Sequence, residues 1–164
     1  MSLPSNAASN ETEIAYWNGA GGRNWVRRQQ GQDAILAPIS QAAIERATVR
    51  PGERVVDIGC GTGATSIELG ERVGPSGHVL GVDVSEPMLA RATERLPAGA
   101  PVKFVRADAT THQFQVATFD LLFSRFGVMF SLSQRAPLRT CAMRCDRGAG
   151  SHSLAGARAT RIRG

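Results

Sequence analysis

The stretch VVDIGCGTG, residues 55–63, constrains the fold of this 164-residue chain more than any other stretch. An apolar run interrupted by one carboxylate opens it and predicts a short buried strand. Three glycines, Gly59, Gly61 and Gly63, follow at every second position. Glycines permit a tight turn and let a ligand approach backbone N–H groups, and the helix start behind them adds a partial positive field. The stretch therefore predicts a strand, turn and helix that bind a nucleotide-like ligand.

Helical and strand periodicities alternate around this stretch. Helices are expected over residues 33–48, 64–73 and 85–96, and strands over residues 54–58, 78–84, 102–107 and 119–124. Asp33 and Ser85 are the expected N-caps. The first of these helices is expected to bury one apolar face, made of Ile35, Leu36, Ile39, Ala43 and Ala47. Because this order is typical of α/β proteins, we expect a Rossmann-like parallel sheet flanked by helices.

Polar side chains end the predicted strands, where ligands bind in such sheets. Asp83 lies twenty residues after Gly63, a distance at which an acid can accept hydrogen bonds from both ribose hydroxyls. Asp108 ends the next strand, where an adenine amino group would lie, although aspartate also ends strands for turn formation alone. Ser124 ends the fourth strand. Asp57 lies within the apolar run, and because an unpaired carboxylate is costly to bury, we expect it to serve the site.

Aromatic residues and glycines gather in residues 14–25, IAYWNGAGGRNW. This segment is expected to be a loop or short helix that folds over something. The aromatic faces would suit a cation or an adenine ring, and a hydrophobic clasp on the domain is an equally open interpretation. Residues 1–13 are polar and acidic, so we expect a disordered N-terminus without an apolar targeting segment, and a cytoplasmic location.

The basic character of the chain, with a pI of about 10.0, comes from its last part. Residues 131–164 hold seven arginines and one acid, Asp146, whereas residues 1–130 are nearly balanced. A nucleic-acid interface would depend on those last residues alone, and none is expected. Cys141, Cys145 and His152 are too few for a zinc site, so no metal is expected. No apolar run is long enough for a membrane span.

Four segments resemble, in order and spacing, those of class I S-adenosylmethionine-dependent methyltransferases. They are DIGCGTG at 57–63, GVDVSEPML at 81–89, VRADA at 105–109 and FDLLFSRFGVMF at 119–130. The resemblance extends from about Trp17 to Phe130 and implies transfer of a methyl group from S-adenosylmethionine to a small-molecule acceptor, with no metal. It identifies neither the acceptor nor a catalytic residue.

The resemblance also implies roles for the motif residues. Gly59, Gly61 and Gly63 would lie beside the methionine part of the cofactor, and Asp57 would face its amino group. Asp83 would bind the ribose. The base would contact Met88, Asp108 and Ala109, and Ser124 would end the fourth strand of the cofactor site.

Two other interpretations stay open at this point. Gly59, Gly61 and Ala64 also fit the G-x-G-x-x-A pattern of NAD(P)-binding oxidoreductases, in which Asp83 would again bind a ribose. Asp57 before the turn and Gly63 within it argue against that pattern. The other interpretation is a non-catalytic binding module that acts through its basic last residues, for which salt-dependent nucleic-acid binding would be diagnostic.

The resemblance stops after Phe130. The chain is therefore divided into residues 1–13, a methyltransferase domain over residues 14–130, and a basic tail over residues 131–164 that is expected to be poorly ordered. Class I methyltransferases have seven strands, so the sheet is expected to be C-terminally truncated to about four. Residues 119–124 would then form an uncovered edge strand, which favours aggregation, and turnover by the truncated chain is a separate question.

The genetic code suggests an origin for this tail. When the codons of residues 142–156 are read from the third base of the first codon, GC-rich choices give the peptide HALRPGGRLAFACW. That peptide has the helix end, Pro-Gly-Gly turn and buried strand that the family has at this place. We hypothesise a single-base shift near the codon of Phe130. Sequencing the gene tests this, because one insertion or deletion there must restore a longer methyltransferase reading frame.

Overall fold

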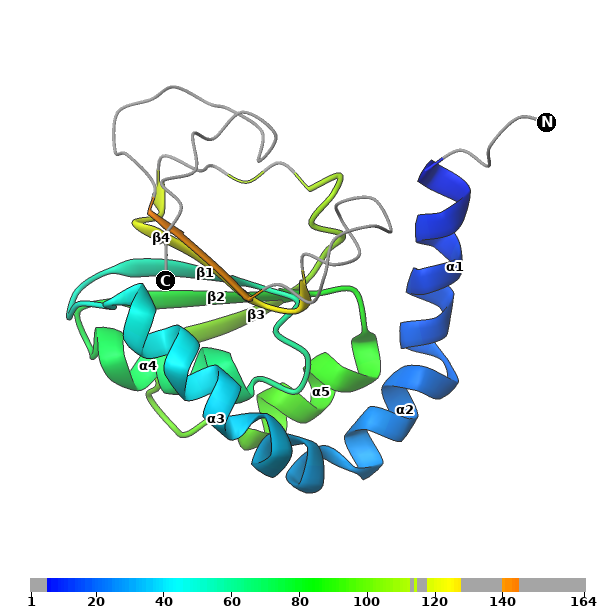
Figure 1. Cartoon of the computed structure of the whole chain (residues 1–164), viewed down its shortest axis with the longest axis horizontal. Helices are drawn as coiled ribbons and strands as arrows, with labels where there is room; N and C mark the ends of the chain where they lie inside the picture. Colours follow the sequence, from blue (N-terminus) through cyan, green and yellow to red (C-terminus); the bar gives the residue numbers. More distant parts are fainter. Residues whose placement is uncertain (1–5, 113, 115–117, 128–139, 145–164) are drawn as a thin grey trace.

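The computed structural model describes residues 6–112, 114, 118–127 and 140–144, which fold around one sheet (Figure 1). The helices are α1 (Asn6–Asn18), α2 (Ala20–Arg27), α3 (Gln29–Ala47), α4 (Ala64–Val73) and α5 (Glu86–Arg95). The strands are β1 (Arg54–Ile58), β2 (His78–Asp83), β3 (Val102–Arg106), β4 (Leu121–Arg125) and β5 (Thr140–Arg144). None of the helices in these residues is long and apolar enough to cross a membrane.

The sheet has the order β3-β2-β1-β4-β5. Its first four strands are parallel, with Val56 of β1 opposite Leu80 of β2 and Leu122 of β4. The predicted parallel α/β sheet is therefore confirmed. Because the first four strands point the same way, the carboxyl ends of β1, β2, β3 and β4 meet at one edge of the sheet.

Strand β5 was not predicted. It runs antiparallel to β4 and covers its outer edge, so the expectation that β4 would be an uncovered edge strand is wrong. Arg144 at the end of β5 donates to Glu53 Oε1 at 2.6 Å and to the carbonyl of Thr48 at 2.8 Å. The poor order expected for residues 131–164 does not hold at residues 140–144, which form β5. The other expectations for this tail, including those for Cys145 and His152, lie outside the described residues, as does the side chain of Cys141.

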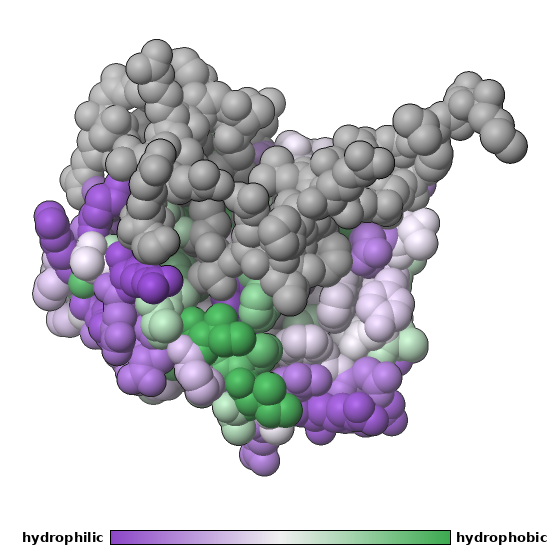
Figure 2. All heavy atoms as spheres, viewed as in Figure 1, coloured by the Kyte–Doolittle hydropathy of each residue, from purple (hydrophilic) through white to green (hydrophobic). Residues whose placement is uncertain are grey.

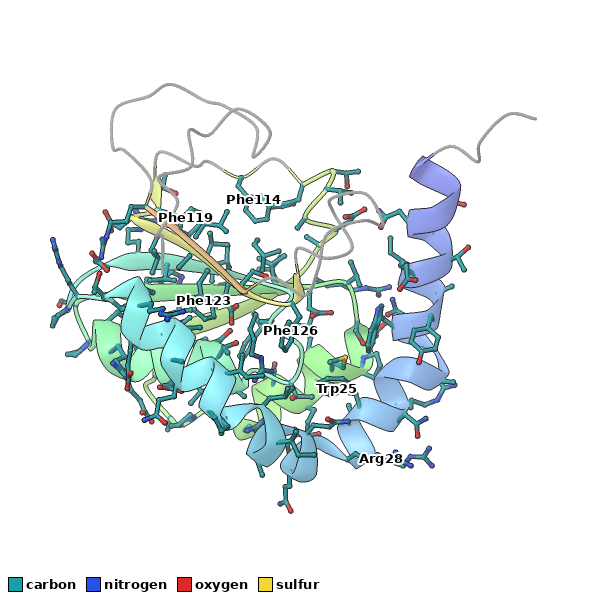
Figure 3. The ribbon with its side chains drawn as sticks, in the orientation of Figure 1. Trp25, Arg28, Phe114, Phe119, Phe123 and Phe126 are labelled. Carbon is teal, nitrogen blue, oxygen red and sulfur yellow. The ribbon has the colours of Figure 1, made fainter. Side chains whose placement is uncertain are left out.

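Helices α3, α4 and α5 cover one face of the sheet (Figure 1). There Ile44 of α3 and Leu69 of α4 pack on Val55 and Phe123, all fully buried. On the opposite face Phe114 and Phe119 pack over Ile58 and Leu122 (Figure 3). The branched and aromatic side chains of the strands therefore hold the sheet between two apolar layers, and leave its carboxyl edge to the loops.

The helices that precede β1 differ from expectation. Residues 6–13 belong to α1, so the predicted disorder is wrong there. Helix α3 begins at Gln29, and Asp33 lies inside it rather than at its N-cap. Figure 2 shows apolar surface gathered over α3, where Ile35 and Ile39 are 72% and 45% exposed. Only the later part of the predicted apolar face, including Ala47, is buried.

Candidate functional site

A cavity of about 330 Å³ opens at the carboxyl edge of the sheet. The cavity is lined by the carboxyl ends of four strands and the loops that follow them: residues 58–62 at β1, 82–84 at β2, 107–110 at β3 and 125–127 at β4. Three helices complete its wall, with Met88 of α5, Trp25 of α2, and Asn10, Glu13, Ile14 and Trp17 of α1. Trp25 and Phe126, both labelled in Figure 3, lie where the end of β4 faces α2 and α5. Of the predicted site residues, Gly59, Gly61, Asp83, Met88, Asp108 and Ala109 line this cavity.

The glycine turn after β1 has the left-handed backbone that glycine permits. Gly59 has φ +71°, and a Cβ on it would lie 2.3 Å from the Cα of Gly127. Gly61 has φ +56°, and a Cβ there would lie 2.8 Å from the Cε of Met88. The turn is therefore closed on both sides by backbone and by Met88, and larger residues do not fit it.

Gly63 has a different position from the one predicted. It does not line the cavity, and a Cβ on it would meet Ala92 and Phe104 at 2.9 Å each. It starts α4 with φ +82°. Gly63 therefore lets the start of α4 lie close to Ala92 of α5 and Phe104 of β3, instead of lying beside a ligand.

Arg95 at the end of α5 stabilises the glycine turn after β1. Its Nη1 donates to the carbonyl of Thr62 at 2.8 Å, and its Nη2 lies 2.8 Å from Asp33 Oδ2 of α3. One guanidinium thus joins the glycine turn to two helices. Asp33, which lies inside α3, therefore serves this ion pair rather than a helix N-cap.

Asp83 at the end of β2 reaches under the glycine turn. Its Oδ2 accepts the N–H of Gly61 and its Oδ1 accepts the N–H of Ser85, both at 2.8 Å. Burial raises the pKa of Asp83, and these backbone hydrogen bonds oppose the rise. Because a carboxylate oxygen can accept more than one hydrogen bond, both oxygens can still accept a ligand hydroxyl.

Asp108 at the end of β3 is joined to α1. Asn10 Nδ2 donates to its Oδ2, and the N–H of Thr110 donates to its Oδ1 at 2.8 Å. The cavity wall made by α1 is therefore fixed to the sheet by a contact between residues far apart in the sequence.

Asp57 and Ser124 are not in the cavity lining, unlike the prediction. Asp57 is fully buried, and its Oδ2 accepts hydrogen bonds from Thr65 Oγ1 and Ser66 Oγ at 2.7 Å each. Ser124 donates through its Oγ to the carbonyl of Ile58 at 2.8 Å. Asp57 thus stabilises the first turn of α4, and Ser124 stabilises the end of β1.

Burial raises the pKa of Asp57 from 3.8 to about 6, against the hydroxyl hydrogen bonds and the nearby Arg125 guanidinium. The folded chain keeps a proton there that the unfolded chain has released, so the free energy of unfolding falls as pH rises from about 4 to about 6. A shift of this size corresponds to roughly 3 kcal/mol. Urea unfolding across this range should show the fall in the wild type and a clearly smaller fall in Asp57→Asn, in which Asp83, whose pKa is also raised, still titrates. If the free energy of unfolding changed with pH equally in the wild type and in Asp57→Asn, the raised pKa assigned to Asp57 would be contradicted.

Asn10, Glu13 and Phe126 are wall residues that were not predicted, whereas Ile14, Trp17 and Trp25 belong to the segment 14–25 that was expected to fold over something. Asn10, Glu13, Ile14 and Trp17 recur at helical spacing on one face of α1, but the face is too polar to have an apolar period. Phe126 has φ +74°, a strained value for an aromatic residue, and no sequence pattern indicates it. The spacing of four in α1 was the one feature that could have revealed this wall.

The family model described as a methyltransferase domain matches residues 55–148, more than half of the chain. The chain belongs to the methyltransferase domain family. This agrees with the recognition of the four segments as those of a class I S-adenosylmethionine-dependent methyltransferase. The match continues beyond Phe130, where the resemblance of the four segments ends, and it includes β5.

Relatives of this methyltransferase domain include nocamycin O-methyltransferase from Saccharothrix syringae, 37% identical over 54% of this chain and 32% of that protein. Demethylmenaquinone methyltransferase from Staphylococcus aureus is 40% identical over 49% of this chain and 33% of that protein. Among solved structures, phosphoethanolamine N-methyltransferase 2 from Haemonchus contortus in complex with S-adenosyl-L-methionine is 31% identical, with a TM-score of 0.50 over 56% of this chain and 22% of that chain. The chain spans a third or less of the length of these relatives.

Proposed function

We propose that this domain binds S-adenosylmethionine in the cavity at the carboxyl edge of the sheet and transfers its methyl group to a small-molecule acceptor. The observation that carries the proposal is the contact between Asp83 and Gly61, because it brings the acid at the end of β2 and the glycine turn after β1 to one cavity. In this proposal Gly59 and Gly61 lie beside the methionine part, Asp83 binds the ribose, and the base contacts Met88, Asp108 and Ala109.

The charge of the cavity supports a cationic ligand. Its ionisable walls include three carboxyl groups, those of Glu13, Asp83 and Asp108, and one guanidinium, that of Arg125. A sulfonium is favoured by this balance, whereas the pyrophosphate of a nicotinamide cofactor would be repelled. The balance, together with the family, disfavours the oxidoreductase interpretation.

The bound sulfonium would supply an activated methyl group, and the domain would contribute mainly alignment, which is worth roughly 7–11 kcal/mol in well-oriented reactions. Trp17 and Trp25 pack edge to face with ring centroids 6.1 Å apart. Both indoles line the cavity, so they would exclude water from its α1 and α2 side. The names of the relatives refer to small molecules, which supports a small-molecule acceptor.

The proposal makes a direct prediction for fluorescence, because Trp17 and Trp25 are the two tryptophans of the chain and both line the cavity. Titration with S-adenosylhomocysteine should change tryptophan emission and saturate, and calorimetry should give the same Kd. NADH, titrated by calorimetry as the control, should give no binding heat. Binding of NADH without binding of S-adenosylhomocysteine would refute the proposal. A chain with the reading frame restored after Phe130 should bind at least as tightly.

A further inference from the structure

In the proposed function the aromatic and glycine segment at residues 14–25 excludes water through Trp17 and Trp25, but it also contacts the turn that follows Asp83. In the structure it is the end of α1, a turn at Gly19, and α2. It packs against the turn between β2 and α5, residues 84–87, and helices α2 and α5 lie side by side (Figure 1). A Cβ on Gly22 would lie 2.7 Å from Ser85 Oγ, so the two segments are in close contact.

Asn18 makes the polar part of this contact. Its Nδ2 donates to the carbonyl of Val84 at 2.9 Å, and its Oδ1 accepts the N–H of Glu86 at 3.0 Å. The same Nδ2 also donates to the carbonyl of Ile14 at 2.8 Å, which fixes the side chain to its own helix. The amide therefore spans both sides of Ser85 in a single orientation.

Ser85 adds a hydrogen bond that is donated from the turn to α1. It is fully buried, and its Oγ donates to the carbonyl of Trp17 at 2.6 Å. A serine at a helix N-cap ordinarily accepts a backbone N–H of that helix, but Ser85 makes no such capping bond. Asn18, 68 residues away in the sequence, accepts the first N–H of α5 instead.

The turn of residues 84–86, which Asn18 and Ser85 fix to α1, orients the Asp83 carboxylate. The N–H of Ser85 donates to Asp83 Oδ1, while Asp83 Oδ2 accepts the N–H of Gly61. A continuous series of hydrogen bonds thus leads from Asn18 through the backbone of residues 84–86 to the carboxylate and the glycine turn.

We propose that Asn18 is a positioning residue for the cofactor site, which fixes the turn that aims the Asp83 carboxylate and so couples docking of α1 and α2 to ligand binding. This inference depends on the proposed function for the identity of the ligand. Asn18 touches no ligand itself, because it is not in the cavity lining. It acts through the backbone of Val84, Ser85 and Glu86.

The test compares Asn18→Ala with Asn24→Ala, a matched control in α2 whose exposed side chain contacts only Arg27 among the described hydrogen bonds. In ligand-free protein, amide hydrogen exchange of residues 84–88 should become faster in Asn18→Ala and stay unchanged in Asn24→Ala. Calorimetric affinity for S-adenosylhomocysteine should fall about 5- to 20-fold in Asn18→Ala only, as expected for the loss of one to two net hydrogen bonds.

A ligand without ribose hydroxyls separates positioning from general loss of structure. For 2′,3′-dideoxy-S-adenosylhomocysteine, wild type and Asn18→Ala should bind with equal affinity, because Asp83 no longer has a hydroxyl partner. If Asn18→Ala lost the same affinity for both ligands, Asn18 would have a merely structural role and the inference would be overturned. Unchanged exchange, or unchanged affinity for S-adenosylhomocysteine, would also overturn it. Absence of binding by the wild type would refute the proposed function and the positioning role together, whereas wild-type binding that Asn18→Ala retains would refute the positioning role alone.

Discussion

Gly59→Ala is expected to destabilise the fold by about 2 to 5 kcal/mol and to remove ligand binding. Alanine at φ +71° costs about 1–2 kcal/mol in the left-handed region. Its Cβ would also lie 2.3 Å from the Cα of Gly127, and relieving such overpacking costs about 1–3 kcal/mol. Because the contacting atom of Gly127 belongs to the backbone, it cannot rotate away as a side chain could, and the end of β4 must move away from β1. Urea denaturation, followed by circular dichroism, measures the loss.

Gly99→Ala is the matched control for this change. Gly99 also has a positive φ, of +78°, but no heavy atom lies within 4 Å of the Cβ position. Replacement of this glycine by alanine should therefore lower the free energy of unfolding only by the cost of the left-handed backbone, about 1–2 kcal/mol, and leave ligand affinity unchanged. Equal destabilisation by the two substitutions would show that the contact between the β1 and β4 loops is not tight.

Asp83→Ala is expected to weaken binding of S-adenosylhomocysteine by about 100-fold or more. Each hydrogen bond to a charged group contributes about 1.5–3 kcal/mol, and in the proposed function Asp83 accepts two from the ribose. The change also leaves the N–H groups of Gly61 and Ser85 without their acceptor, which loosens the glycine turn. Calorimetric titration measures the effect.

Asp120→Asn is a suitable control, because Asp120 also accepts a backbone N–H, that of Arg54 at 2.9 Å, but at the amino-terminal edge of the sheet. Its affinity should equal that of the wild type. Burial raises the pKa of Asp83, so wild-type affinity should fall on acidification at a higher pH than an ordinary carboxylate would allow. Asp83→Asn should lose this pH dependence. Wild-type affinity in Asp83→Ala would refute the assignment of the ribose site.

The sequence predicted the part of the fold whose pattern is local. Strand β1 and helix α4 were predicted with their observed bounds, since an apolar run, a glycine turn and an amphipathic helix are all visible in the chain itself. Helix α1 was missed because its inward face mixes the polar side chains of Asn10 and Glu13 with Ile14 and Trp17, which leaves no apolar period. Strand β5 was missed because it depends on pairing with β4, a tertiary contact with no local pattern.

The candidate site could be predicted where strand ends bring residues together. Asp83 and Asp108 line the cavity as expected from the carboxyl ends of β2 and β3. Asp57 was placed at the site because an unpaired carboxylate is costly to bury, and Ser124 because it ends the fourth strand, but Asp57 Oδ2 accepts from hydroxyls of α4 and Ser124 donates to the carbonyl of Ile58 instead. Sequence shows that a buried polar group needs a partner without showing which partner it has.

The division of the chain at residue 130 and the frame-shift hypothesis stay predictions. The methyltransferase family model continues to residue 148, and residues 145–164 lie outside the described residues. The gene sequence around the codon of Phe130 decides the matter directly.

The capping of α5 by Asn18 has a consequence for how the chain folds. The contact joins residues 68 positions apart, and closing such a long loop is entropically unfavourable until other contacts have shortened it. We therefore expect β1, β2 and β3, whose paired residues lie much closer in sequence, to associate first and the N-terminal helices to dock late, after the transition state. Substitutions in the Asn18 contact should then accelerate unfolding and leave the refolding rate nearly constant, so that assembly of the pocket is among the last events on the folding pathway.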